Sequence, residues 1–162
     1  MMQTLTAPSQ RSIIKSIDVN VPADHAFLVF TERFATWWPL ASHHIGAAEA
    51  ATAVMEPRVG GRWFERGIDG SECMWGHVLA WEPPHRVVLR WEISAKWQHD
   101  PDLHTEVEVR FIEEGEERTR VELEHRYLEN FGDDAATMHA AFDTENAWAG
   151  LLRDFAAAAE AK

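Results

Sequence analysis

The stretch GGRWFERGIDGSECMWGHVLAWEPPHRVVLRW, residues 60–91, contains four tryptophans and three pairs of turn-forming residues. The pairs are Gly60-Gly61, Asp69-Gly70 and Pro83-Pro84, and runs rich in β-branched and aromatic residues separate them. Asp-Gly between two such runs is among the strongest short signals for a β-hairpin. The stretch therefore predicts consecutive antiparallel strands whose bulky rings either fill a core or face a bound ligand.

Similar signals continue on both sides of this stretch. Gly115, within EEGEE, separates two further runs of alternating residues. The turn spacing predicts strands near residues 12–20, 51–58, 61–68, 72–82, 86–93, 105–113 and 118–127. Two short helices are expected after the first strand, because Pro22 suits the first turn of PADHAFLVF and FATWWP must end before Pro39.

Alternation along the strands predicts that one face of the sheet is dry and the other is solvated. Arg90 and Glu92 belong to the solvated face, and Arg62, Glu65 and Arg66 are interpreted in the same way. The predicted inward residues are Val87, Leu89, Trp91 and Ile93, then Val107, Val109 and Phe111, then Val121, Leu123, His125 and Tyr127.

The C-terminal segment DTENAWAGLLRDFAAAAEAK predicts the helix that covers the dry face. Trp148, Leu151, Leu152 and Phe155 follow the spacing i, i+3, i+4 and i+7, which places them on one side of a helix. Asp143 is expected to cap the start of this helix. The predicted order is therefore a strand, two short helices, a meander of strands and a long helix.

Length and composition favour one domain. The chain has 162 residues, of which 46% are hydrophobic and 26% charged, as in an ordinary soluble globular protein. We expect a flexible N-terminus over residues 1–11 and a single domain over residues 12–160. The lone Cys73 cannot form an internal disulfide and favours a reducing compartment.

Charge and hydropathy restrict the classes of partner that we expect this protein to bind. Fifteen Lys and Arg against 27 Asp and Glu give a formal charge of −12, which repels nucleic acid and anionic lipid surfaces. The N-terminal MMQTLTAPSQR lacks the pattern of a signal peptide, and no apolar run reaches the length of a membrane span. We expect a cytoplasmic protein that binds neither nucleic acid nor membranes.

The stretch 60–91, together with TEVEVRF, TRVELEHR and the terminal segment around Trp148, resembles a known group of bacterial proteins. These are related to the C-terminal domain of the activator of the heat-shock-protein-90 ATPase, in the SRPBCC superfamily that includes START lipid-transfer domains and the birch pollen allergen. The resemblance covers residues 12–160. It implies an α+β helix-grip fold, in which a curved antiparallel sheet wraps around a long C-terminal helix, often with a hydrophobic cavity between them.

The resemblance leaves three classes of function open, because a shared fold does not determine activity. We favour a protein that binds an apolar or amphipathic small molecule, without catalysis or a cofactor. The alternatives are a stress-response co-chaperone and a small cyclase or hydrolase that uses His125 and a carboxylate. The eukaryotic activator has a separate N-terminal domain that this chain has no room for, so we do not expect stimulation of a chaperone ATPase.

If the sheet grips the helix, inward residues of both converge on a ligand pocket. Trp37 and Trp38 are adjacent on one short helix and cannot both point inward comfortably, so at least one is a candidate for the mouth of the cavity, although packing of the helix against the sheet is favoured. Core packing is the simpler explanation for each tryptophan alone. The predicted ligand-binding residues are Trp37, Trp38, Phe64, Trp75, Leu89, Trp91, Val109, Leu123, His125, Trp148, Leu152 and Phe155.

The histidines offer two further candidate sites. His125 is predicted on the dry face, where a neutral imidazole either orients a ligand or bonds to a neighbour in the core. The segment WQHDPDLH brings together His99, Asp100, Asp102 and His104, which are metal-ligand types without metal-site spacing. We interpret it as a polar loop and expect no bound metal, and we interpret His43-His44 as a solvated loop pair.

Overall fold

Seven antiparallel strands form one sheet in the computed structural model, which describes residues 11–161. Apart from Arg11, the predicted flexible segment 1–11 lies outside the described residues. The spatial order is β1-β7-β6-β5-β4-β3-β2, so every strand from β2 to β7 pairs with its neighbour in sequence. The strands are β1 (Ser12–Val19), β2 (Ala50–Met55), β3 (Arg62–Gly67), β4 (Glu72–Glu82), β5 (Arg86–Trp91), β6 (Thr105–Gly115) and β7 (Arg118–Arg126).

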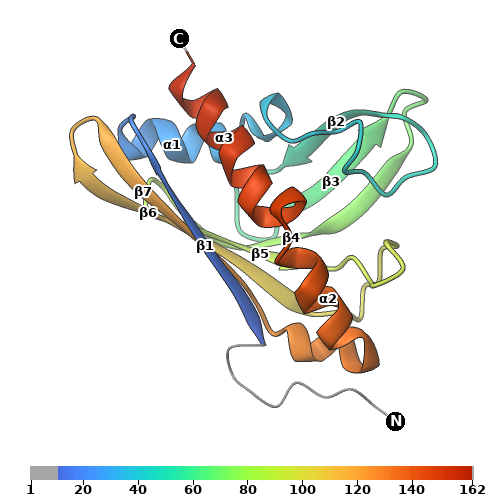
Figure 1. Cartoon of the computed structure of the whole chain (residues 1–162). Helices are drawn as coiled ribbons and strands as arrows, with labels where there is room; N and C mark the ends of the chain where they lie inside the picture. The colour runs from blue at the N-terminus through green and yellow to red at the C-terminus, as the bar shows by residue number, and fades with distance from the viewer. Residues whose placement is uncertain (1–10, 162) are drawn as a thin grey trace.

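The helices gather on one side of the curled sheet. Figure 1 shows α3 and α2 crossing that side in succession, with α1 beside α3. This arrangement confirms the expected α+β helix-grip fold. The helical elements are α1 (Ala23–Phe30), η2 (Phe34–Thr36), η3 (Leu128–Asp134), α2 (Ala135–Phe142), η4 (Glu145–Ala149) and α3 (Gly150–Glu160).

The C-terminal helix differs from the prediction. Asp143 does not cap its start but ends α2, a helix that the sequence analysis missed. The chain then passes through a π-helical turn, η4, in which Ala147 has non-helical angles of φ −94° and ψ −134°, before α3 begins. A spacing of 3.6 residues between apolar side chains predicts which residues are buried. It does not show whether the helical backbone is broken within that segment. The predicted stripe from Trp148 to Phe155 is buried despite the break.

Tyr127 is also placed differently from the prediction. It is 44% exposed, whereas His125, two residues earlier, is fully buried. The strand β7 ends at Arg126, and Tyr127 has a positive φ of 64°. Alternation applies only while the backbone stays extended, so it fails at the first residue beyond the strand.

Aromatic rings pack between the sheet, α1, η2 and α3. Phe34 lies in edge-on contact with Trp63 and with Trp75, each at 5.9 Å between ring centroids. Phe30 of α1 meets Phe155 of α3 at 5.3 Å, which connects the two helices. Edge-on pairs of this kind add to the hydrophobic gain from burying large rings.

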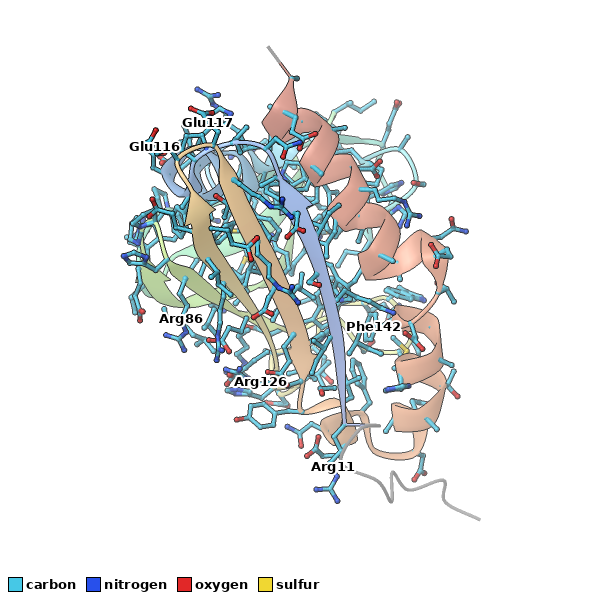
Figure 2. All side chains as sticks on the ribbon, turned by 60° about the vertical axis from the view of Figure 1, so that its left-hand side comes forward. Arg11, Arg86, Glu116, Glu117, Arg126 and Phe142 are labelled. Atoms are coloured by element: carbon cyan, nitrogen blue, oxygen red, sulfur yellow. The ribbon has the colours of Figure 1, made fainter. Side chains whose placement is uncertain are left out.

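The opposite face of the sheet is charged, as the alternation predicted, but Glu92 and Glu108 on this face are buried rather than solvated. Figure 2 shows Arg86 and Arg126 on the side of the sheet away from α2 and α3. Both arginines donate to the buried carboxylate of Glu108, Arg126 at 2.7 Å, and Arg110 donates to it at 3.3 Å. Burial opposes ionisation of Glu108, but these arginines outweigh it and lower its pKa to about 2.

Candidate functional site

A pocket of about 370 Å³ lies between the sheet, the helix α2, the turn η4 and the loop 39–49. Figure 2 shows Phe142, at the end of α2, on the side of the sheet that the helices cover. None of the described residues that line the pocket is Lys, Arg, Asp or Glu. The lining residues are Trp38, Ser42, His43, His44, Ile45, Trp75, Trp91, Ile93, Trp97, Ala141, Phe142, Thr144, Asn146, Ala147, Trp148 and Leu151.

Four tryptophans predicted from the sequence form its walls. Trp38 lies 5.3 Å from Trp75 and 6.1 Å from Trp148, and Trp148 lies 5.9 Å from Trp91, measured between ring centroids. The rings come from the chain after η2, from β4, from the end of β5 and from η4. Elements far apart in sequence therefore contribute one continuous aromatic surface.

The other predicted ligand-binding residues do not line this pocket. Phe64 is buried beneath the guanidinium groups of Arg62 and Arg66, which lie 4.3 and 5.5 Å from its ring centroid. The remaining seven belong to the hydrophobic core or pack against it. They are Trp37, Leu89, Val109, Leu123, His125, Leu152 and Phe155.

Trp37 and Trp38 are both buried, which agrees with the favoured packing of the short helix against the sheet. The indole of Trp37 donates to the carbonyl of Val29 at 3.0 Å, and the indole of Trp38 donates to the carbonyl of His43 at 2.8 Å. The two rings stay in edge-on contact, with 5.8 Å between their centroids, and of the pair only Trp38 lines the pocket.

His125 lies behind the pocket wall rather than in the lining. Its Nδ1 accepts a hydrogen bond from the indole of Trp148 at 3.2 Å, so its Nε2 carries the proton and donates to Thr105 Oγ1 at 2.9 Å. Complete burial lowers the pKa of His125 to about 3. The ring is therefore neutral, and both of its nitrogens are used within the protein.

His43 and His44 are half-buried lining residues, which corrects their interpretation as a solvated pair. His43 Nδ1 lies 2.7 Å from Ser42 Oγ, and its Nε2 lies 3.2 Å from the carbonyl of Asn146. Local composition suggested an exposed loop here. The loop instead packs against η4, a contact between segments about a hundred residues apart that no local pattern carries.

Glu65 is 1% exposed, and its interpretation as a solvated residue was wrong. Its oxygens accept hydrogen bonds from the indole of Trp75 at 2.8 Å and from the backbone N–H groups of Ile45 and Gly46 at 2.6 and 3.1 Å. A buried carboxylate requires such donors. Glu65 thus joins the loop 39–49 to the tryptophan wall of the pocket.

The histidines of WQHDPDLH pair with carboxylates of the sheet. His99 Nε2 lies 2.9 Å from Glu92, and His104 Nε2 lies 2.6 Å from Glu106. Among residues 11–161, no group of three or more His, Cys, Asp or Glu side chains is arranged to hold a metal ion. None of the described helices is long and apolar enough to cross a membrane.

Comparisons with solved structures give close matches in fold. An anthrahydroquino-gamma-pyrone synthase shares 42% identity with this chain, with 90% of this chain and 94% of that one covered and a TM-score of 0.63. The self-sacrificing resistance protein CalC from Micromonospora echinospora shares 27% identity over 93% of this chain and 94% of its own, with a TM-score of 0.70.

An HSP90 activator from Plasmodium falciparum shares 22% identity over 72% of this chain and 73% of its own, with a TM-score of 0.52, and this likeness concerns the fold alone. A comparison with curated proteins gives no significant match. Residues 20–160 match the family model described as activator of Hsp90 ATPase homolog 1-like protein. The chain therefore belongs to the family of activator of Hsp90 ATPase homolog 1-like proteins.

Proposed function

We propose that this protein binds a planar aromatic small molecule in the pocket walled by Trp38, Trp75, Trp91 and Trp148. The observation that carries the proposal is the pocket itself, which places four indoles around a space of about 370 Å³. This volume lies within the usual range for small-molecule sites, and indole faces pair well with flat rings.

The chemistry of the lining favours an uncharged ligand. Its apolar surface comes from tryptophan, Phe142, Ile45 and Ile93, and its polar groups are hydroxyl, amide and imidazole side chains. A ligand already ionised in solution would lose its hydration on entry without meeting a Lys, Arg, Asp or Glu side chain in the lining, so we infer a ligand that enters the pocket uncharged. Hydroxyl or carbonyl groups at the edge of an aromatic ring system match this set of donors and acceptors.

Catalysis on the bound aromatic molecule is a second candidate function. It is favoured by the 42% identity to a protein named as an anthrahydroquino-gamma-pyrone synthase, and by the two histidines in the lining. We infer a ring closure of the cyclase type as the reaction class. A chaperone partner is supported by the family name, but the outer sheet face carries paired charges rather than the large apolar patch typical of a docking surface.

The binding proposal is tested by filling the pocket. Ala141 lines it, whereas its neighbour Ala140 on the same helix is exposed and lies outside the lining. Titration of the wild type with anthraquinone is expected to quench tryptophan emission saturably. Ala141→Phe should abolish the saturable phase, and the matched control Ala140→Phe should preserve it. Equal binding by both variants, or no saturable binding by the wild type, would contradict the proposal.

A further inference from the structure

His44 has one ring nitrogen held by the protein and one left open. Its Nδ1 lies 3.1 Å from the carbonyl oxygen of Gly46 and 3.7 Å from Oε2 of Glu65. A carbonyl and a carboxylate accept hydrogen bonds and do not donate them, so in the neutral ring the proton belongs on Nδ1. Nε2 then carries a lone pair, and no residue among 11–161 forms a hydrogen bond with it.

The second histidine of the pocket differs in this respect. His43 contacts Ser42 Oγ through Nδ1 and the carbonyl of Asn146 through Nε2, so both of its nitrogens are engaged. Both imidazoles line the same space. His44 is consequently the pocket histidine that offers a ligand an unused acceptor within the described part of the chain.

Glu65 holds His44 in place through the backbone of the following residues. Its carboxylate accepts from the N–H groups of Ile45 and Gly46, and the carbonyl of Gly46 in turn receives Nδ1–H of His44. The same carboxylate receives the indole N–H of Trp75. One buried side chain therefore sets the tautomer and position of His44 relative to an aromatic wall, as a carboxylate or carbonyl does for a catalytic histidine.

We propose that His44 Nε2 accepts the proton of a phenolic or enolic hydroxyl on the bound aromatic molecule, and that Glu65 is a positioning residue for His44. This inference rests on the proposed binding function and adds the ligand class, a planar aromatic molecule with an ionisable hydroxyl. In the transfer, the ligand O–H bond breaks and an Nε2–H bond forms. The resulting imidazolium stands beside the Glu65 carboxylate, which offsets its charge.

The proposal is tested with two probes that differ at one group, β-hydroxyanthraquinone and β-methoxyanthraquinone. The methyl ether keeps the ring system but has no proton to give. Wild-type protein should bind the hydroxyl compound about tenfold more tightly, which corresponds to about 1.4 kcal/mol for one buried hydrogen bond. The bound hydroxyl compound should also show increased long-wavelength absorption from its ionised form.

Variants of the protein then show which residue causes the difference in affinity between the two probes. His44→Phe should bind both probes with equal affinity, and His43→Phe should preserve the ratio of the two affinities whatever it does to each. Glu65→Gln should reduce both the ratio of the two affinities and the long-wavelength absorption of the bound hydroxyl compound. If Glu65 had a purely structural role, its substitution would not change that absorption. Thermal melts identify any variant that fails to fold, and the wild-type comparison of the two probes stands without variants.

The outcomes separate this inference from the binding function. If neither probe binds the wild type, the proposed function fails. If both bind with equal affinity, or if the preference for the hydroxyl survives in His44→Phe, binding stands and the assignment of His44 is overturned.

Discussion

The indole Nε1 of Trp148 lies 3.2 Å from Nδ1 of His125, and this bond fastens the helical wall of the pocket to the sheet. The chain of contacts continues, because His125 Nε2 donates to Thr105 Oγ1, which donates to the carbonyl of Trp91 at 3.1 Å. Two pocket tryptophans from distant elements are thus connected through one buried imidazole. A satisfied buried network of this kind specifies a single arrangement of the groups it joins.

The neutral state of His125 predicts how stability changes with pH. Its pKa is about 3 in the folded protein, because burial disfavours the charged ring, and about 6.5 in an unfolded chain. Between these values the unfolded state binds a proton that the folded state does not, so stability falls as pH falls. We expect a loss from this group of about 1.4 kcal/mol per pH unit below about pH 6.5.

His125→Gln is the matched variant, because its amide can accept and donate but does not titrate. Urea unfolding at several pH values above 5 avoids the region where Glu108 begins to contribute, since that carboxylate has an ordinary pKa of 4.5 and a folded pKa of about 2. The stability difference between the wild type and the variant should shrink as pH falls. Parallel curves would show that His125 does not titrate as described.

Trp148 and Trp37 should respond differently to truncation. Both are buried and both indoles donate a buried hydrogen bond, to His125 and to the carbonyl of Val29, but Trp148 lines the pocket and Trp37 does not. A ring that borders a void has fewer packing partners to lose. We expect Trp148→Ala to cost about 3 kcal/mol and Trp37→Ala about 5 kcal/mol, the two ends of the usual range. Chemical unfolding measures both, and a larger loss for Trp148→Ala would argue against an open space beside it.

Trp97 should contribute to binding but not to stability. It lines the pocket, is 48% exposed, and has a positive φ of 58°. That conformation is strained for a bulky side chain and free of strain for glycine. We expect Trp97→Gly to keep or raise the melting temperature while it weakens anthraquinone binding severalfold. A marked fall in melting temperature would assign the ring a packing role instead.

Glu65 should matter for stability far more than a charged neighbour on the same sheet. Glu65→Leu removes the acceptor for three N–H groups, and each donor left buried and unpaired costs about 1–3 kcal/mol. Glu72→Leu, the control, breaks solvent-exposed pairs with Arg62 and Arg66 and should have a much smaller effect. Similar unfolding midpoints for the two variants would contradict the role of Glu65.

Local chemistry was enough to predict the strands. The pairs Asp69-Gly70 and Pro83-Pro84 lie in the connections between β3 and β4 and between β4 and β5, close to where their turn signals placed them. Alternation also placed His125 on the dry side, because the side-chain period of two holds wherever the backbone is extended. The same rule could not say whether His125 faces a ligand or the core, since both environments are dry.

The pocket was decided by tertiary contacts. Trp38, Trp75, Trp91 and Trp148 were predicted as ligand-binding residues, but they come from four segments far apart in the sequence, and no local pattern shows that these segments meet. The partners that complete the site, His43 and His44, lie in a loop whose composition resembles any solvated loop. Periodicity reports the local backbone, whereas burial of a loop depends on which distant segment covers it.

Glu65 is the clearest example of the difference between what neighbouring residues predict and what the tertiary structure decides. By itself, the segment RWFERG places a charged residue between arginines, which is the composition of an exposed strand face. In the folded protein, the backbone N–H groups of Ile45 and Gly46 arrive from a loop twenty residues away and replace the water that the carboxylate loses. The sequence by itself determined the strands and the dry face, because both depend on neighbours along the chain. Only the tertiary structure decided that this carboxylate is buried, because the donors that make burial possible come from elsewhere in the fold.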